Sequence, residues 1–110
     1  MEIIKILSED KARVEKIDTL YWIYFNNLQY KQDSTIQVEI EVEIDSARAK
    51  AGCQACTTVK ILSSEGNKHT LEITYDTTNI GDFTKTVTFF YTKNEVESSV
   101  VMRIQGTVTR

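Results

Sequence analysis

The chain has 110 residues, and its 13 Lys and Arg residues against 16 Asp and Glu residues give a formal net charge of −3. This length predicts one domain, residues 1–110, and 41% apolar with 26% charged residues excludes both disorder and a membrane protein. No run of Lys or Arg provides the basic surface that nucleic-acid binding needs. The amino end has no basic segment followed by an apolar stretch, so it does not predict a secretory signal.

The composition favours β-structure. The chain contains 12 Ile, 9 Val and 14 Thr, about a third of all residues, and no proline. β-branched side chains are stiff and pack well on a pleated surface, which predicts an all-β domain.

The amino-terminal part, residues 1–19, is expected to hold a short strand at 3–7 and a connecting loop at 8–17, where Ser8 can cap one helical turn. Six further β-branched and aromatic segments, separated by turn residues, each predict a strand: residues 20–28, 36–44, 57–62, 69–75, 83–92 and 99–109. About seven antiparallel strands at this spacing are typical of an immunoglobulin-like β-sandwich, here over residues 20–110.

The segment 36–44 alternates strictly between apolar and polar residues, so one face is buried and the other is solvated. Its polar face carries Glu39, Glu41 and Glu43, spaced about 7 Å apart. A straight exposed strand has no cleft for catalytic carboxylates. The strip is interpreted as a solvated face that discourages edge-to-edge aggregation, or as a docking strip for a basic partner.

Two of the predicted strands are apolar on both faces. In one, Trp22 and Tyr24 point away from Tyr21; in the other, Phe90 points away from Phe89. A strand with one solvated face alternates cleanly. The second face is therefore covered by an element such as the amino-terminal segment, or it contacts another protein chain.

Cys53 and Cys56 form a single Cys-x-x-Cys. Zinc needs four ligands, and His69 is the only histidine, so a metal site would need a carboxylate or another chain. A redox pair normally lies at a helix start, whereas residues 57–59 read as a strand. The remaining interpretation is two small residues in a loop, whose oxidation depends on the compartment.

No catalytic pattern is present. No serine lies in a Gly-x-Ser-x-Gly turn, and no glycine-rich loop precedes a helix. His69 flanks a turn and is predicted at the surface rather than as a general base. We therefore expect neither an enzyme nor a cofactor.

Three segments carry a family resemblance: residues 52–58 (Gly-Cys-Gln-Ala-Cys-Thr-Thr), 81–88 (Gly-Asp-Phe-Thr-Lys-Thr-Val-Thr) and 103–108 (Arg-Ile-Gln-Gly-Thr-Val). In order and spacing they resemble a bacterial domain of unknown function with the pattern Cys-Gly-Cys-Thr … Gly-x-Phe-x-Lys-Thr-Val … Gly-x-Val. That domain is grouped with the hydin-like and major-sperm-protein-like immunoglobulin-type sandwiches. The chain separates its cysteines by two residues where the family usually has one.

The motif residues of this resemblance are Gly52, Cys53, Cys56, Gly81, Phe83 and Gly106. Gly81 permits a tight turn before a strand, and Phe83 is expected to close one end of the sandwich. Gly106 indicates a bulge or a close backbone approach.

Family members are usually exported or lipid-anchored, and this chain shows no signal. It resembles the small auxiliary (decoration) proteins on the heads of tailed phages, including crAss-like ones. The resemblance implies a structural module made in the host cytoplasm and placed on the virion surface, where it binds capsid protein or copies of itself. The candidate contact residues are Tyr21, Trp22, Tyr24, Phe90, Glu39, Glu41 and Glu43.

Two alternatives stay open. One is a bacterial envelope or cell-surface domain, in the periplasm or outside the cell if a signal was removed, with a metal- or redox-active cysteine loop. The other is a module of a larger cell-surface protein. Because no proline protects the sheet edges, these edges are open to pairing with a partner.

Overall fold

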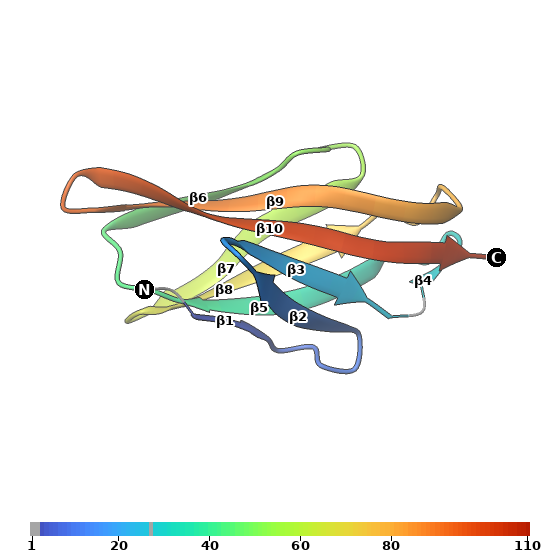
Figure 1. Ribbon diagram of the computed structural model, residues 1–110, viewed down its shortest axis with the longest axis horizontal. Helices are drawn as coiled ribbons and strands as arrows, with labels where there is room; N and C mark the ends of the chain where they lie inside the picture. Colours follow the sequence, from blue (N-terminus) through green and yellow to red (C-terminus); the bar gives the residue numbers. More distant parts are fainter. Residues whose placement is uncertain (1–2, 27) are drawn as a thin grey trace.

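The computed structural model describes residues 3–26 and 28–110, which form a sandwich of two β-sheets (Figure 1). Asn27, from the end of a predicted strand, lies outside the described residues. These residues contain no helix, and so none long and apolar enough to cross a membrane. The strands are β1 (Ile3–Ile6), β2 (Ala12–Ile17), β3 (Leu20–Phe25), β4 (Leu28–Gln29), β5 (Ser34–Glu41), β6 (Ser46–Ala51), β7 (Thr57–Glu65), β8 (Lys68–Tyr75), β9 (Gly81–Lys93) and β10 (Val96–Thr109).

The order of the strands is that of an immunoglobulin constant-type domain. The four-stranded sheet has the order β1-β5-β8-β7, and the six-stranded sheet has the order β2-β3-β10-β9-β6, with β4 beside β10. Immunoglobulin domains place strands A, B, E and D in one sheet and C, F and G in the other. β1, β5, β8 and β7 match the first set, and β6, β9 and β10 match the second. The predicted all-β immunoglobulin-like sandwich is confirmed.

The sequence predicts seven of these strands and misses β2, β4 and β6. β6 reads Ser-Ala-Arg-Ala-Lys-Ala, residues with weak β-propensity, and β4 has only two residues. β3 and β4 pair with β10 in parallel, which departs from the expected antiparallel arrangement.

The expectation of a loop with a helical turn over residues 8–17 is wrong for its second half. Ala12–Ile17 form β2, which pairs antiparallel with β3 around a turn at Asp18, whose φ is 55°. One turn does precede the strand, because the Ser8 carbonyl accepts the amides of Lys11 and Ala12. The edge of β3 supplies the backbone partners that make this polar segment a strand.

The strictly alternating segment is confirmed as a strand, β5, but it ends at Glu41 instead of residue 44. Ile36, Val38 and Ile40 are fully buried between the sheets. The Val42 amide then bonds to the Asn67 carbonyl at 2.9 Å, and the chain crosses to β6.

Aromatic rings close the sandwich where β8 ends and β9 begins. The Phe83 ring stacks on Tyr75, with 3.6 Å between the ring centroids, and lies 6.2 Å from the Phe25 ring. Gly106 of β10 lies opposite Phe83. A Cβ on Gly106 would lie 3.0 Å from two carbons of the Phe83 ring and 3.2 Å from Leu28 Cδ1. The close backbone approach expected at this glycine is therefore present.

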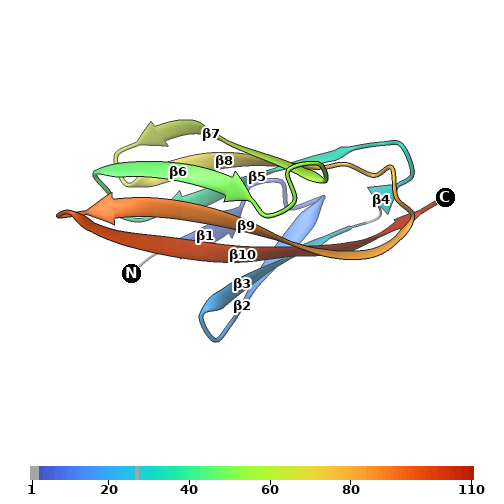
Figure 2. The same cartoon turned by 90° about the horizontal axis from the view of Figure 1, so that it is seen from above.

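The β2–β3 hairpin leans away from the body of the sandwich (Figure 2). β3 runs parallel to β10 and begins at Leu20, so it pairs with β10 only at Met102–Gln105. Within the described residues, positions 96–101 of β10 pair with β9 on one side and with no strand on the other.

We predict that Gly106→Ala lowers the free energy of unfolding by about 1–3 kcal/mol, because the added methyl overpacks the Phe83 ring. Urea denaturation measures the change. Gly52→Ala is the matched control and should change stability by less than about 0.5 kcal/mol, because its Cβ would meet Thr86 only at ordinary contact distances of 3.4 Å and above. Equal effects of the two substitutions would contradict the overpacking at Gly106.

Candidate functional site

Four side chains form a stacked row on the outer face of the six-stranded sheet, which we call the aromatic–arginine column: Arg13, Tyr24, Trp22 and Arg103. Arg13 of β2 pairs across the strands with Tyr24 of β3, and Trp22 of β3 with Arg103 of β10. The Arg13 guanidinium lies 4.3 Å from the Tyr24 ring centroid, and the Arg103 guanidinium 5.8 Å from that of Trp22. The two rings are nearly parallel, with 6.4 Å between their centroids.

The two arginines decide what the column offers to a partner. The Arg13 guanidinium lies over the Tyr24 ring and the Arg103 guanidinium lies near the Trp22 ring, and each guanidinium carries N–H donors. Arg13 has a carboxylate partner, Glu15, at 3.7 Å, whereas Arg103 forms no ion pair within the described residues. The column therefore suits carboxylate groups.

The structure tests one of the two explanations for these aromatic residues, cover by the amino-terminal segment. No strand of that segment lies over Trp22 and Tyr24, because β1 joins the other sheet and β2 lies beside β3 in the same sheet. Both side chains are half-buried by their neighbours. Tyr21 points inward and is only 6% exposed, near the Lys16 ammonium, so this predicted contact residue is part of the core.

Phe90 occupies the same outer face, near the opposite edge of the sheet. The Arg48 guanidinium of β6 lies 4.1 Å from the Phe90 ring centroid and also bonds Glu97 of β10 at 3.2 Å. The positive charge of Arg48 is therefore already paired with a carboxylate of the same chain, Glu97.

Only two of the three glutamates of the predicted acidic strip lie on one strand face. Glu39 and Glu41 share the outer face of β5, opposite Lys5 and Ile3 of β1. Glu43 follows the end of the strand, where its carboxylate bonds the Lys93 ammonium at 2.7 Å. The prediction that Glu43 belongs to the same strand face is wrong, because the chain turns toward the other sheet after Glu41.

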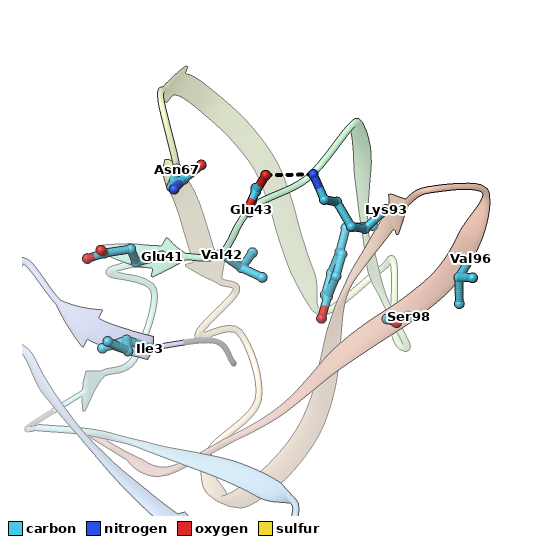
Figure 3. A pocket seen from close by; sticks show the side chains of 9 residues that line it. Ile3, Glu41, Val42, Glu43, Asn67, Lys93, Val96 and Ser98 are labelled. Atoms are coloured by element: carbon cyan, nitrogen blue, oxygen red, sulfur yellow. Dashed lines mark hydrogen bonds and ion pairs between the residues drawn. The ribbon is translucent and has the colours of Figure 1, made fainter.

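A groove of about 600 Å³ lies where β1 begins and β5 ends (Figure 3). Figure 3 shows Ile3 on one side, Val96 and Ser98 of β10 on the other, and Val42 between them. The hydrogen bond from Lys93 to Glu43 raises the pKa of the Lys93 ammonium. The lining residues are Ile3, Glu41, Val42, Glu43, Asn67, Tyr91, Lys93, Val96 and Ser98.

Cys53 and Cys56 are joined in a disulfide across the turn between β6 and β7. The Cys53 carbonyl accepts the backbone amides of Cys56 at 3.1 Å and Thr57 at 2.9 Å. A strand follows the pair, so the pair does not lie at the start of a helix, where redox-active pairs normally lie. Among the described residues, no three His, Cys, Asp or Glu side chains are grouped to hold a metal ion.

The prediction that His69 lies at the surface is wrong, because its side chain is 1% exposed. Its Nε2 lies 3.0 Å from the Val42 carbonyl oxygen, and its Nδ1 lies 2.9 Å from the Ser64 hydroxyl. A carbonyl oxygen only accepts, so Nε2 carries the proton and donates, and in the neutral ring Nδ1 accepts from Ser64. The even spacing of His69 with Leu71 was the sequence signal for this burial.

These features define an immunoglobulin-like β-sandwich whose most distinctive exposed features are a surface column and a groove. The chain belongs to the family described as Protein of unknown function (DUF1573), whose model matches residues 25–108. All three motif segments lie within this match, so the predicted membership of a domain family of unknown function is confirmed. No curated protein matches the chain. β2 and nearly all of β3 lie outside the match, so three of the four column residues belong to a part of the chain that the family model does not cover.

We predict that His69→Ala lowers the free energy of unfolding by about 2–5 kcal/mol, because it leaves a cavity and an unpaired Val42 carbonyl. Ser64→Ala removes one hydrogen bond and should lower it by about 1 kcal/mol. Chemical denaturation compares the two variants. A wild-type stability in His69→Ala would contradict the buried, bonded position of the ring.

We predict that the fold survives loss of the disulfide. A four-residue loop restricts the unfolded chain little, so the bond contributes at most about 2 kcal/mol. Thermal unfolding with and without dithiothreitol should show a small decrease for the wild type and none for the double variant Cys53→Ser/Cys56→Ser. Complete unfolding on reduction would contradict this small contribution.

Proposed function

We propose that this protein is a non-enzymatic structural module that binds another protein chain through the outer face of its six-stranded sheet. The observation that carries the proposal is the aromatic–arginine column. Tryptophan, tyrosine and arginine are the residues most enriched among those that dominate binding energy at protein interfaces. Here two half-buried rings lie on the outer face of the six-stranded sheet. They share this face with Arg103, which has no ion-pair partner among the described residues.

The column supports a protein partner over a sugar or a nucleic acid. Sugar rings and nucleotide bases stack on exposed ring faces, but the Arg13 guanidinium already lies over the Tyr24 ring, and the Trp22 ring lies beside it. The net charge of −3 also disfavours a polyanion. A few carboxylates on a protein surface match the column in both chemistry and number.

In its most specific form, the proposal places the protein on the heads of a tailed phage as an auxiliary (decoration) protein, with capsid protein or copies of itself as partner. This form rests on the resemblance drawn from the sequence. Mass spectrometry of purified particles should find the protein at a copy number comparable with that of the capsid protein. Its absence from particles, or a gene placed among envelope genes instead of capsid and portal genes, would overturn this form.

The disulfide favours one alternative, a bacterial envelope or cell-surface domain, because disulfides persist in oxidising compartments. A metal role for the cysteine loop would require reduced thiols. Zinc retained at one equivalent after reduction and dialysis, and lost in Cys53→Ser, would support that role.

We predict that Arg103→Glu weakens binding to the partner, assayed as binding to purified phage heads, at least tenfold. The substitution places a carboxylate where the column offers a guanidinium to acidic groups. Lys60→Glu is the matched control, because it makes the same charge change on an exposed position, 63% accessible, of the other sheet. It should change affinity less than twofold. Equal effects of the two variants would indicate general electrostatics and would contradict a contact at the column.

A further inference from the structure

The first half of β10 has an open backbone edge. Positions 96–101 pair with β9 on one side, and in the described chain no strand pairs with their other side. Six residues of extended backbone span about 20 Å. About half of them direct both N–H and C=O groups toward the open side. Such an edge is a template for one more strand.

The groove of Figure 3 lies beside this open edge. Ile3 and Val96 line it and are 57% and 63% exposed, among the most exposed large apolar side chains described. Val42 lies between them and is itself buried (Figure 3). A strand added to β10 would direct every second side chain into this groove.

We propose that the open edge of β10 and this groove accept an extended strand from a partner protein. The strand carries apolar side chains at alternate positions and a basic side chain near Glu41. The inference builds on the proposed function, in which the module binds protein chains, but it uses a surface separate from the column.

Two properties of the groove specify this partner. A row of unpaired backbone groups is satisfied by another extended backbone, which is how sheet-edge recognition gains affinity. The charge of the rim specifies the basic side chain of the partner. The Glu43 carboxylate forms an ion pair with the Lys93 ammonium at 2.7 Å, whereas Glu41 forms no ion pair within the described residues. Glu41 lies on the outer side of the groove, so it offers its negative charge to a lysine or arginine that reaches this rim.

The test uses an eight-residue synthetic peptide that alternates valine with threonine and lysine. Amide hydrogen exchange by NMR should show alternate amides of residues 96–101 exchanging fast in the free protein and at least tenfold slower with peptide. Two further peptides carry N-methyl groups on one or the other set of alternate residues. Methylation of the set that faces β10 should weaken binding at least tenfold, and methylation of the other set less than twofold.

Protein variants locate the binding site. Val96→Glu and Ile3→Glu introduce a charge at exposed positions, so the fold should remain, and each should weaken peptide binding at least tenfold. Leu62→Glu on β7 is the matched control, because Leu62 is also exposed (45%) but lies outside the groove. It should leave binding unchanged. Glu41→Lys should weaken binding of this lysine-containing peptide several-fold.

The outcomes separate this inference from the proposed function. Slow exchange at residues 96–101 without peptide, together with a dimer in sedimentation, would show that a second copy fills the edge and would overturn the partner proposed here. Peptide binding that is insensitive to Val96→Glu, or equally weakened by both N-methyl sets, would also overturn it. Arg103→Glu should leave peptide binding unchanged, so a failure at the column and a failure at the groove are distinguishable.

Discussion

β9 and β10 form a hairpin of 13 residue pairs, from Val96↔Lys93 to Val108↔Gly81, and the six-stranded sheet is built around it. β6 pairs with the free side of β9, while β3 and β4 pair with β10. The inner face of the hairpin supplies Phe83, Val87 and Phe89 to the core. Because Gly106 has no side chain, the Phe83 ring can lie against β10 and close one end of the sandwich. The other elements depend on this pairing for their position.

The two candidate surfaces have one cause, the place along β10 where the short strand β3 begins. Where β3 pairs with β10, at Met102–Gln105, it brings Trp22 beside Arg103 and completes the column. β3 begins only at Leu20, one residue before its first pair with β10, so positions 96–101 of β10 keep an open edge next to the groove. Nearly all of the β2–β3 hairpin lies outside the matched residues 25–108 of the family model. The hairpin that the family model does not cover thus supplies three of the four column residues.

Side chains stabilise the two places where the chain crosses between the sheets after β5 and after β6. At the first crossing, His69 bonds the Val42 carbonyl from inside the core, and Lys93 bonds Glu43 from outside. At the second, the disulfide between Cys53 and Cys56 holds the turn. The buried histidine and the cysteine pair therefore each have a structural role at a crossing.

The sequence by itself determined the elements whose signals are local. Strict alternation in β5, β-branched runs in β7 to β10, and the glycines at Gly81 and Gly106 depend on neighbouring residues along one strand, so the all-β sandwich and its family could be predicted. Only the tertiary structure decided the remainder. β6 and β2 are strands because an adjacent edge satisfies their backbone, a gain that propensity does not contain. The partners that satisfy the buried His69 ring, Ser64 and Val42, come from other elements and could not be read from its own strand.

The same division applies to the candidate sites. The double-sided aromatic pattern of Trp22, Tyr24 and Phe90 was visible in the sequence, but Arg13 and Arg103 join it only through strand pairing. The groove had no sequence signal, since Ile3, Val42 and Val96 are far apart in the chain. The absence of proline indicated that the sheet edges were chemically open to a partner. It could not show which edge stays unpaired, because that depends on where β3 begins beside β10.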